Sequence, residues 1–225
     1  MNYKIIKKIE DIIFSLIIIV TFSPILLLCS ILSLLIQGWP IFYISKRRVG
    51  INKVINIIKF RTMVKDAKSD KYGLEKKYMK DGYLDIPLEA EVYTTIGRIL
   101  EKTQIVEVPQ AFSVLFGNIS FVGNRPLPEK NIELLKKKFP NNWEKRFNSP
   151  AGMTGISQVV GKFKLSSRQR LELESLYSEV YQKGNVLKAD AYIFFSTIIL
   201  LLFRDPVAYR SYENAKKILV SCLNK

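Results

Sequence analysis

The groups that could do chemistry in this chain are carboxylates, hydroxyls and cations, because its 225 residues include no histidine. Ser-His-Asp and Cys-His pairs, HExxH zinc sites and imidazole bases are therefore excluded. Acid–base work is left to carboxylates, Lys, Tyr or Cys, and any metal is expected to be a hard ion held by oxygen. Cys29 and Cys222 are the only cysteines, too few for a disulfide framework or a thiolate cluster.

A first candidate for phosphate binding is the run Lys59-Phe60-Arg61-Thr62-Met63. Two cations two residues apart point to the same side of a strand, and Thr62 adds a hydroxyl. This pattern is typical of a phosphate clamp, although a solvated basic strand end has the same composition.

Two glycine-punctuated segments are further candidates. Residues 117–126 contain Gly117, Gly123 and Arg125, and residues 150–162 end in Lys162. Successive backbone amides beside a fixed cation can cradle an anion. Plain turns are the alternative in both cases.

The elements that must position these groups begin with a membrane segment. Residues 12 to 36 form a run of 25 residues without a formal charge in a chain of net charge +15. A helix of that length is about 37 Å long, enough for a hydrocarbon layer of roughly 30 Å. No small-x-small cleavage site follows the run, so we expect membrane insertion rather than a signal peptide.

Ser23-Pro24 lies at the middle of this segment. Proline removes a backbone donor and bends the helix, and Ser23 Oγ can bond a freed carbonyl. Basic residues flank both ends, so the positive-inside bias favours a re-entrant helix with both ends in the cytoplasm, while a kinked span stays open.

The remainder is expected to be α+β and predominantly helical, with a hairpin and amphipathic helices. We divide the chain into a membrane-inserted helix-break-helix, 1–40, and a cytoplasmic, membrane-associated domain, 41–225. The expected elements are a hairpin at 43–60, a mobile loop with one helical turn at 65–88, and helical structure at 95–116 that is broken by Pro109. The basic amphipathic stretch at 129–147 is expected to lie in the headgroup region or on the protein surface. A helix capped by Ser166 or Ser167 should end near Gln182, and the uncharged run at 191–203 is too short to span a bilayer, so an interfacial or core helix is expected there.

Several motifs occur in a specific order along nearly the whole chain. They are the broken apolar segment, Arg48-x-Gly50, Lys59-Phe-Arg-Thr-Met63, Thr95-Ile-Gly-Arg98, Glu107-Val-Pro-Gln110, Phe121-Val-Gly-Asn-Arg-Pro126 and Pro150-Ala-Gly-Met-Thr-Gly155. In these motifs the sequence resembles the bacterial sugar transferase family, the monotopic phosphoglycosyl transferases that act on a polyprenyl carrier.

The resemblance implies transfer of a phosphosugar from a UDP-sugar to undecaprenyl phosphate, with release of UMP. It implies Mg²⁺, a covalent phosphosugar intermediate on an aspartate, and a site at the cytoplasmic face of the inner membrane. It also implies a re-entrant helix, interfacial helices and a small sheet.

This chain departs from the family pattern at the catalytic dyad. Val106 stands where the nucleophilic aspartate belongs and cannot attack phosphorus, while Glu107 is retained. Glu101 replaces a usual Arg; a like charge about 4 Å from a phosphate costs on the order of 4 kcal/mol at an effective dielectric of about 20. Asn124 replaces a proline, and Ile156 a frequent Trp.

Glu107 is therefore the expected catalytic residue. The residues expected to bind substrate phosphate are Lys59, Arg61, Thr62, Arg125, Arg48 and Gln158. Three interpretations stay open: a transferase in which Glu107 or another carboxylate takes over, direct transfer without a covalent intermediate, or a silent paralogue that binds carrier lipid, nucleotide sugar or a partner transferase.

Two other classes fit less well. The basic residues are interleaved with apolar runs and form no nucleic-acid module, so nucleic-acid binding is not expected. A membrane adaptor without a ligand site is the remaining class. The sugar, the glycan pathway and homo-oligomer formation are left open by the sequence.

Overall fold

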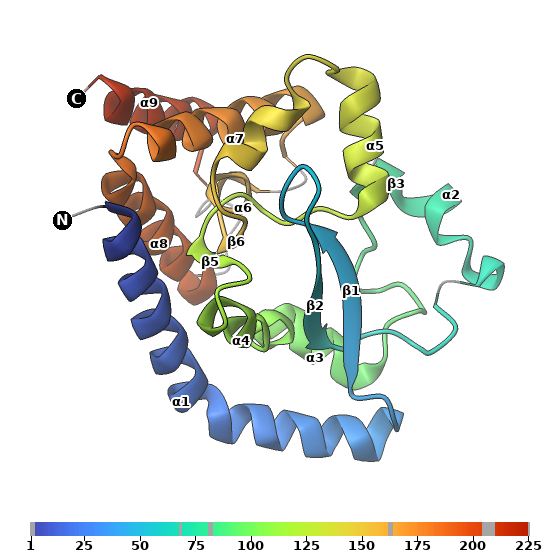
Figure 1. Cartoon of the computed structure of the whole chain (residues 1–225). Coiled ribbons are helices and arrows are strands. Elements are labelled where there is room, and N and C mark those ends of the chain that lie inside the picture. The colour runs from blue at the N-terminus through green and yellow to red at the C-terminus, as the bar shows by residue number, and fades with distance from the viewer. Residues whose placement is uncertain (1–2, 68, 81–82, 162–163, 204–209, 225) are drawn as a thin grey trace.

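The described residues form helices, one long antiparallel hairpin, one short antiparallel strand pair and one short parallel strand pair (Figure 1). The structure, a computed structural model, describes residues 3–67, 69–80, 83–161, 164–203 and 210–224. Its elements are α1 (Tyr3–Gln37), β1 (Phe42–Arg48), β2 (Val54–Phe60), η1 (Asp70–Tyr72), α2 (Leu74–Tyr78), β3 (Met79–Lys80), β4 (Tyr83–Leu84), α3 (Thr95–Thr103), η2 (Ile105–Glu107), α4 (Gln110–Leu115), β5 (Ser120–Val122), α5 (Glu129–Lys138), η3 (Trp143–Asn148), β6 (Gly152–Thr154), α6 (Ile156–Val160), α7 (Ser167–Gln182), α8 (Val186–Phe203) and α9 (Tyr212–Leu223). The predicted class, α+β and predominantly helical, is confirmed.

Helix α1 is one helix with a bend, and Figure 1 shows its two halves pointing in different directions. Pro24 lies inside it and leaves the carbonyl of Val20 without its usual amide partner. Ser23 Oγ donates to that same carbonyl at 2.8 Å. The predicted kink and its serine cap are therefore both present.

The first half of α1 is held to the domain by buried polar contacts. Lys7 is 4% exposed, and its Nζ donates to the carboxylate of Asp190 in α8 and, at 2.9 Å, to the carbonyl of Val122. The carboxylate of Asp11 accepts from Ser120 Oγ and from the amide of Phe121 at 2.7 Å. These bonds fix the helix against α8 and β5.

The second half of α1 is exposed and apolar, with Leu35 76% and Leu27 65% exposed. Helices α1 and α8 are both long and apolar enough to cross a membrane, by length and composition. The helix that contains the uncharged run 191–203 is longer than the run, because α8 already begins at Val186. Val186, Ala189 and Ile193 lie in the main core, which agrees with the expectation of a core helix. Lys188 and Asp190 lie in the first turns of α8, before the uncharged run, and Asp190 is ion-paired with Lys7.

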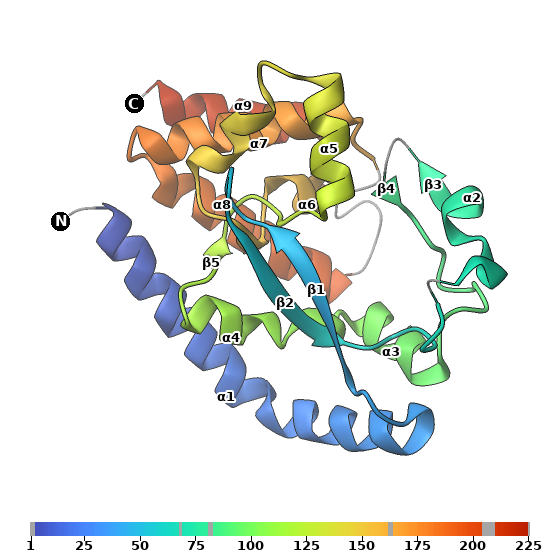
Figure 2. The ribbon, with the colours of Figure 1, turned by 45° about the vertical axis from the view of Figure 1, so that its right-hand side comes forward.

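The hairpin at 43–60 is confirmed. In the register of β1 and β2, Tyr43 faces Lys59 and Arg48 faces Val54. Figure 2 shows its turn end close to α5 and its open end close to α3. Residues that alternate along β1 therefore face two different sides of the molecule.

The helical stretch at 95–116 is broken earlier than expected. Helix α3 ends at Gln104, which has a positive φ of 60° and turns the chain into η2. Pro109 instead lies just before the first turn of α4, where a missing amide costs nothing. Glu107 is therefore on a tight turn between two helices and not within a helix.

The apolar side of the basic stretch at 129–147 is used inside the protein. Ile132 and Leu135 of α5 are buried with Trp143, and Phe139 and Phe147 pack against them. This stretch is thus packed on the domain, with its lysines exposed and Leu134 36% exposed. Its position relative to lipid headgroups stays a prediction.

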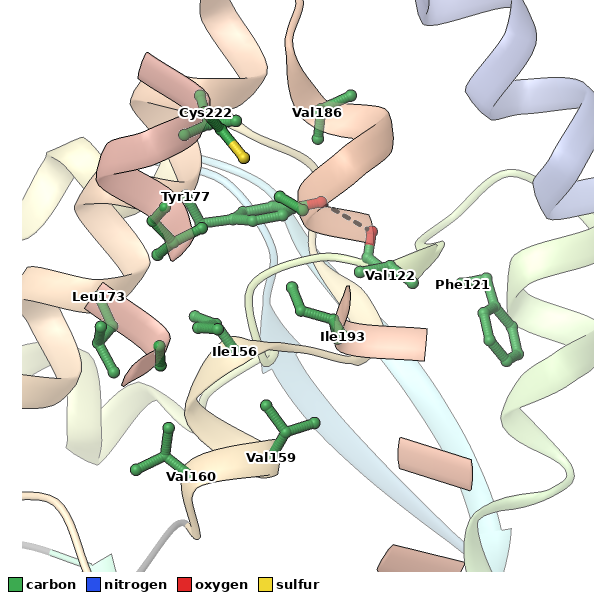
Figure 3. Close-up of a cluster of buried hydrophobic side chains, with 14 of the residues drawn as sticks. Phe121, Val122, Ile156, Val159, Val160, Leu173, Tyr177, Val186, Ile193 and Cys222 are labelled. Carbon is green, nitrogen blue, oxygen red and sulfur yellow. Dashed lines mark hydrogen bonds between the residues drawn. The ribbon is translucent and has the colours of Figure 1, made fainter. Parts of the chain in front are cut away.

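The main core lies between α7, α8, α9 and the β5–β6 pair (Figure 3). Tyr177 is fully buried at its centre, and its hydroxyl donates to Asp190 at 2.7 Å and to the carbonyl of Val122 at 3.3 Å. Helix α7 begins with the predicted cap, a capping box of Ser166 and Gln169. The core thus supports β5, from which the next residues lead into the site.

The segment 65–88 holds more structure than the one helical turn expected. Within its described residues, η1 and α2 are followed by the short antiparallel pair of β3 and β4. The two-part division of the chain falls between the end of α1 at Gln37 and the start of β1 at Phe42. The depth of each part in a membrane stays a prediction.

Candidate functional site

Glu107 and Arg125 form the centre of the candidate site. Arg125 Nη2 donates to Glu107 Oε1 at 3.0 Å, and the two side chains are 25% and 22% exposed. Glu107 comes from η2, and Arg125 follows β5, 18 residues later in the chain. The carboxylate raises the pKa of Arg125 above its ordinary value, while burial opposes the rise. The expected pairing of a carboxylate with a phosphate-binding cation is therefore assembled.

Arg47 is a third member of the site that the motifs did not single out. Burial lowers the pKa of Arg47, and the nearby positive charge of Arg125 lowers it further. Glu107 acts in the opposite direction and raises it. Two guanidinium groups and one carboxylate thus lie within electrostatic range of each other, an arrangement that an added anion would stabilise.

Lys59 lies on the same face of the hairpin as Arg47. Its partner across the strands is Tyr43, and Lys59 Nζ lies 5.8 Å from the centre of the Tyr43 ring. Tyr43, Ser45 and Arg47 alternate along β1 and share this face. Lys59 therefore remains a candidate for phosphate binding.

Arg48 points to the opposite face of the strand from Arg47, but it lines the same pocket as Arg125. Its Nε and Nη2 donate to the two carboxylate oxygens of Glu129 in α5 at 2.8 and 2.7 Å. Strand alternation is the physical reason, because adjacent residues of a strand face opposite sides. In this structure Arg48 ties the hairpin to α5, and a phosphate contact of Arg48 stays a prediction.

Arg61 is also placed differently from the expectation. Its guanidinium donates to the carbonyls of Gln37, Gly38, Pro40 and Met63 at 2.7 to 3.1 Å. Carbonyls at a helix C-terminus lack amide partners and attract cations. Arg61 thus closes the end of α1 and does not form a clamp with Lys59.

Thr62 binds a carboxylate in this structure. Thr62 Oγ1 donates to Glu101 Oε1 at 3.0 Å. Its carbonyl accepts from Thr94, and a Cβ on Gly97 would lie 1.9 Å from that carbonyl oxygen. Gly97 is therefore required for α3 to pack on β2, and the packing places Glu101 beside the strand end.

The two glycine segments are not anion cradles at their centres. The amides of Ser120 and Gly123 donate to the carbonyls of Ala151 and Thr154, and the amide of Gly152 donates to Asn124. A Cβ on Gly152 would lie 2.1 Å from the nitrogen of Gly123, so these glycines permit close packing of parallel strands. Lys162 lies outside the described residues.

Gln158 braces the turn after β6. Its Nε2 donates to the carbonyl of Met153 at 3.0 Å. Its Oε1 is buried and has no hydrogen-bond partner among the residues that the structure describes. A role of Gln158 in substrate binding stays a prediction.

Val106 faces away from the ion pair. It is 1% exposed and belongs to an apolar cluster with Phe60, Ile96 and Leu100. Leu26 and Cys29 of α1 pack against the same cluster. The side chain at this position therefore joins η2 to the membrane helix, and Glu107 next to it faces Arg125.

The described part of the chain brings together no group of three or more His, Cys, Asp or Glu side chains that could hold a metal. Glu101 and Glu107 nevertheless both raise the pKa of Arg125, so two carboxylates act on one point of the site. Mg²⁺ is commonly held by one or two carboxylates together with substrate phosphates. Glu101 and Glu107 are the carboxylates available to such an ion, and Mg²⁺ stays a prediction.

Comparison of the sequence with known protein families identifies the family of this chain. The family model for bacterial sugar transferases matches residues 2–204. The chain belongs to the bacterial sugar transferase family. The family and the two long apolar helices together assign the transferase to a membrane.

Three relatives illustrate the similarity. An uncharacterized sugar transferase of Haemophilus influenzae is 30% identical over 210 residues, 91% of this chain and 42% of that protein. The exopolysaccharide production protein ExoY of Sinorhizobium fredii is 29% identical, over 85% of this chain and 83% of that protein. The UDP-glucose:undecaprenyl-phosphate glucose-1-phosphate transferase of Klebsiella pneumoniae is 30% identical, over 85% of this chain and 39% of that protein. The chain spans less than half the length of the first and the third.

Arg47, which sequence reasoning missed, had a usable signal. Arg47 sits at an even spacing from Tyr43 on β1, and Tyr43 pairs with Lys59. A strict application of strand alternation to the predicted hairpin selects Arg47 for the face of Lys59 and puts Arg48 on the other face.

Proposed function

We propose that this transferase moves a phosphosugar from a UDP-sugar to undecaprenyl phosphate. The observation that carries the proposal is the Glu107–Arg125 ion pair with Arg47 beside it. Relatives named as undecaprenyl-phosphate sugar phosphotransferases support it. The surface glycan to which the product belongs is left to experiment.

In this reaction an oxygen attacks the phosphorus that bears the sugar, and the bond from that phosphorus to the bridging oxygen breaks. UMP leaves with the bridging oxygen. Arg125 and Arg47 stabilise the charge that develops on the phosphoryl oxygens, as cations do in phosphoryl transfer. Because a bound diphosphate competes with Glu107 for Arg125, substrate binding releases the carboxylate of Glu107 for the reaction.

Glu107 has two chemical routes open to it. Its carboxylate attacks phosphorus and forms a covalent intermediate, or it orients the carrier phosphate for direct attack. Mg²⁺, if bound, neutralises charge on the diphosphate, and Glu101 and Glu107 are the residues that would hold it. Lys59, on the face of the hairpin that carries Arg47, is a further candidate for binding the diphosphate.

We place the site at the cytoplasmic face of the inner membrane, with α1 entering the bilayer. Basic residues before and after the apolar run support this orientation. The bend at Pro24 supports a re-entrant path, because each half of the uncharged run 12–36 has only about twelve residues, roughly 18 Å, too few to cross a bilayer alone.

The test is UMP release from a panel of UDP-sugars by the purified protein with undecaprenyl phosphate and Mg²⁺. Glu107→Gln is expected to lower kcat by at least about 100-fold, in the range for loss of a positioned acid–base or nucleophilic group. The matched control is Glu75→Gln, which breaks an exposed ion pair with Lys130 and should leave kcat within twofold. Chelation by EDTA should stop release if Mg²⁺ is required.

A silent paralogue is the second candidate, and Val106 in the position of the family aspartate favours it. No UMP from any donor in a panel that covers the common UDP-sugars would contradict the enzyme. Retention of UDP binding by calorimetry, lost on Arg125→Ala, would then support a binding role.

A further inference from the structure

Two charged residues that the proposed reaction does not use form an ion pair in the core. Arg146 of η3 donates from Nε to Glu174 Oε2 of α7 at 2.8 Å, and the side chains are 1% and 0% exposed. Desolvation offsets most of the attraction in such a pair, so it is a weak source of stability. Positioning of neighbouring groups explains the presence of this ion pair better than stabilisation of the fold does.

The other arm of the same guanidinium reaches the backbone of the site. Arg146 Nη2 donates to the carbonyl of Arg125 at 2.7 Å. The side chain of that same Arg125 pairs with Glu107. A planar guanidinium can serve two partners at a fixed angle, whereas a lysine offers only a point charge. The Arg146 fork therefore sets where the main chain of Arg125 lies.

The residue before Arg125 is held by the same elements. Asn124 is 3% exposed, and its Nδ2 lies 2.8 to 3.1 Å from the carbonyl oxygens of Arg146 and Glu174 and from the hydroxyls of Ser149 and Ser178. One amide nitrogen carries two protons, so these four contacts share them. A proline would restrict the chain through its fixed φ, and here hydrogen bonds to η3 and α7 restrict it instead.

The chain just after Arg125 is also fixed. The amide of Arg48 donates to the carbonyl of Leu127 at 2.8 Å, which ties the segment to the hairpin that carries Arg47. The backbone is thus held before, at and after Arg125. Only side-chain rotation remains to be fixed, and Glu107 fixes it.

We propose that Asn124, Arg146 and Glu174 form a positioning network that holds Arg125 in register with Glu107 and with the diphosphate of the substrate. This inference rests on the proposed function. Asn124, Arg146 and Glu174 are 3%, 2% and 0% exposed, so they act through the main chain of Arg125.

The first experiment is a double-mutant cycle on UMP release. Arg146→Lys keeps the buried charge but loses the fork, and it is expected to lower kcat/KM for the UDP-sugar about tenfold or more, since small misplacements are costly. In an Arg125→Ala background the same change should cost less than twofold. Lys145→Ala, an exposed cation of the same η3, is the control and should change nothing. Equal losses in both backgrounds would overturn the proposal.

The second experiment does not depend on turnover. The coupling between Glu107→Gln and Arg125→Gln is measured as the non-additive part of their melting-temperature shifts, first in the wild type and then with Arg146→Lys. Positioning predicts that the coupling disappears in the variant background, and an unchanged coupling refutes it. Asn124→Ala leaves the buried ion pair in place and provides the same measurement if Arg146→Lys does not fold. Absence of UMP from the wild type would contradict the proposed function alone.

Discussion

Replacing Val106 by aspartate tests whether this position belongs to the site or to the core. Val106 is 1% exposed among Phe60, Ile96 and Leu100. The substitution loses about 2 kcal/mol of apolar burial and desolvates a neutral carboxyl group at about 2 kcal/mol. The sum of about 4 kcal/mol corresponds to a fall in Tm of roughly 8–16 °C for a chain of this size. We expect no gain of UMP release, because the new carboxyl group points away from Arg125.

The pH dependence of this variant has a definite sign. Burial raises the folded-state pKa of the introduced carboxyl group above its unfolded value of about 3.9. The variant therefore loses stability as pH rises from about 4 towards the folded-state pKa, by about 1.4 kcal/mol for each pH unit that separates the two pKa values. The Tm deficit relative to wild type should be larger at pH 7.5 than at pH 4.5.

Differential scanning fluorimetry in detergent at the two pH values provides the measurement. Val106→Thr has the same shape with one hydroxyl in place of a methyl and should show a smaller deficit that does not depend on pH. A Val106→Asp protein that melts within about 2 °C of wild type and releases UMP faster would refute the placement of this side chain in the core.

Three further outcomes are expected. Arg61→Met removes four donated bonds to carbonyls at the end of α1 and should lower Tm by roughly 6–12 °C, for a loss of about 3 kcal/mol; an unchanged Tm would contradict the capping role. Ser23→Ala should lower Tm by roughly 2–4 °C. Ser30→Ala should lower Tm by less, because the Ser30 hydroxyl donates to the carbonyl of Leu26, which also has its helical amide partner. Equal shifts in the two variants would argue against the cap. A hydrogen bond from Lys216 and a weaker influence of the bond from Tyr212 lower the pKa of Glu172. The contribution of the ionised Glu172 to stability is therefore present above its unfolded-state pKa and disappears as pH falls through its folded-state pKa. Glu172→Gln should therefore lower Tm slightly at pH 7 but not near pH 3, and an equal shift at both values would be contrary to this.

Local patterns predicted the parts of the fold whose causes are local. Pro24 breaks the amide ladder of α1 wherever the chain folds, and Ser166 caps α7 through a bond to Gln169, three residues away. The hairpin at 43–60 followed from alternation and turn residues. Each of these features is decided within a few residues, so the sequence is sufficient.

Long-range partners decided the features that were missed. The sequence around Arg61 has the composition of a phosphate clamp. The carbonyls that accept its hydrogen bonds come from Gln37 and Gly38, which lie more than 20 residues away in the chain. The sequence of α5 fitted a helix in the headgroup region or a surface helix equally, and its packing against Trp143 is set by residues beyond the helix itself. Arg125 and Glu107 were identified from motifs, whereas Arg146 shows no motif and becomes visible only through its bond to a main-chain oxygen.

The closed end of α1 has a mechanical consequence. Gln37 donates to the carbonyl of Arg61 at 2.9 Å, and its own Oε1 accepts from Thr94 at the start of α3, while Thr62 binds Glu101. The exposed half of α1 is therefore connected through these hydrogen bonds to the end of β2 beside the site, and the bend at Pro24 lies at its other end. In a bilayer whose thickness changes, tilting of that half must move Thr62 and Glu101 together. Lipid composition then becomes a variable of the rate, to be controlled in vesicles of defined chain length.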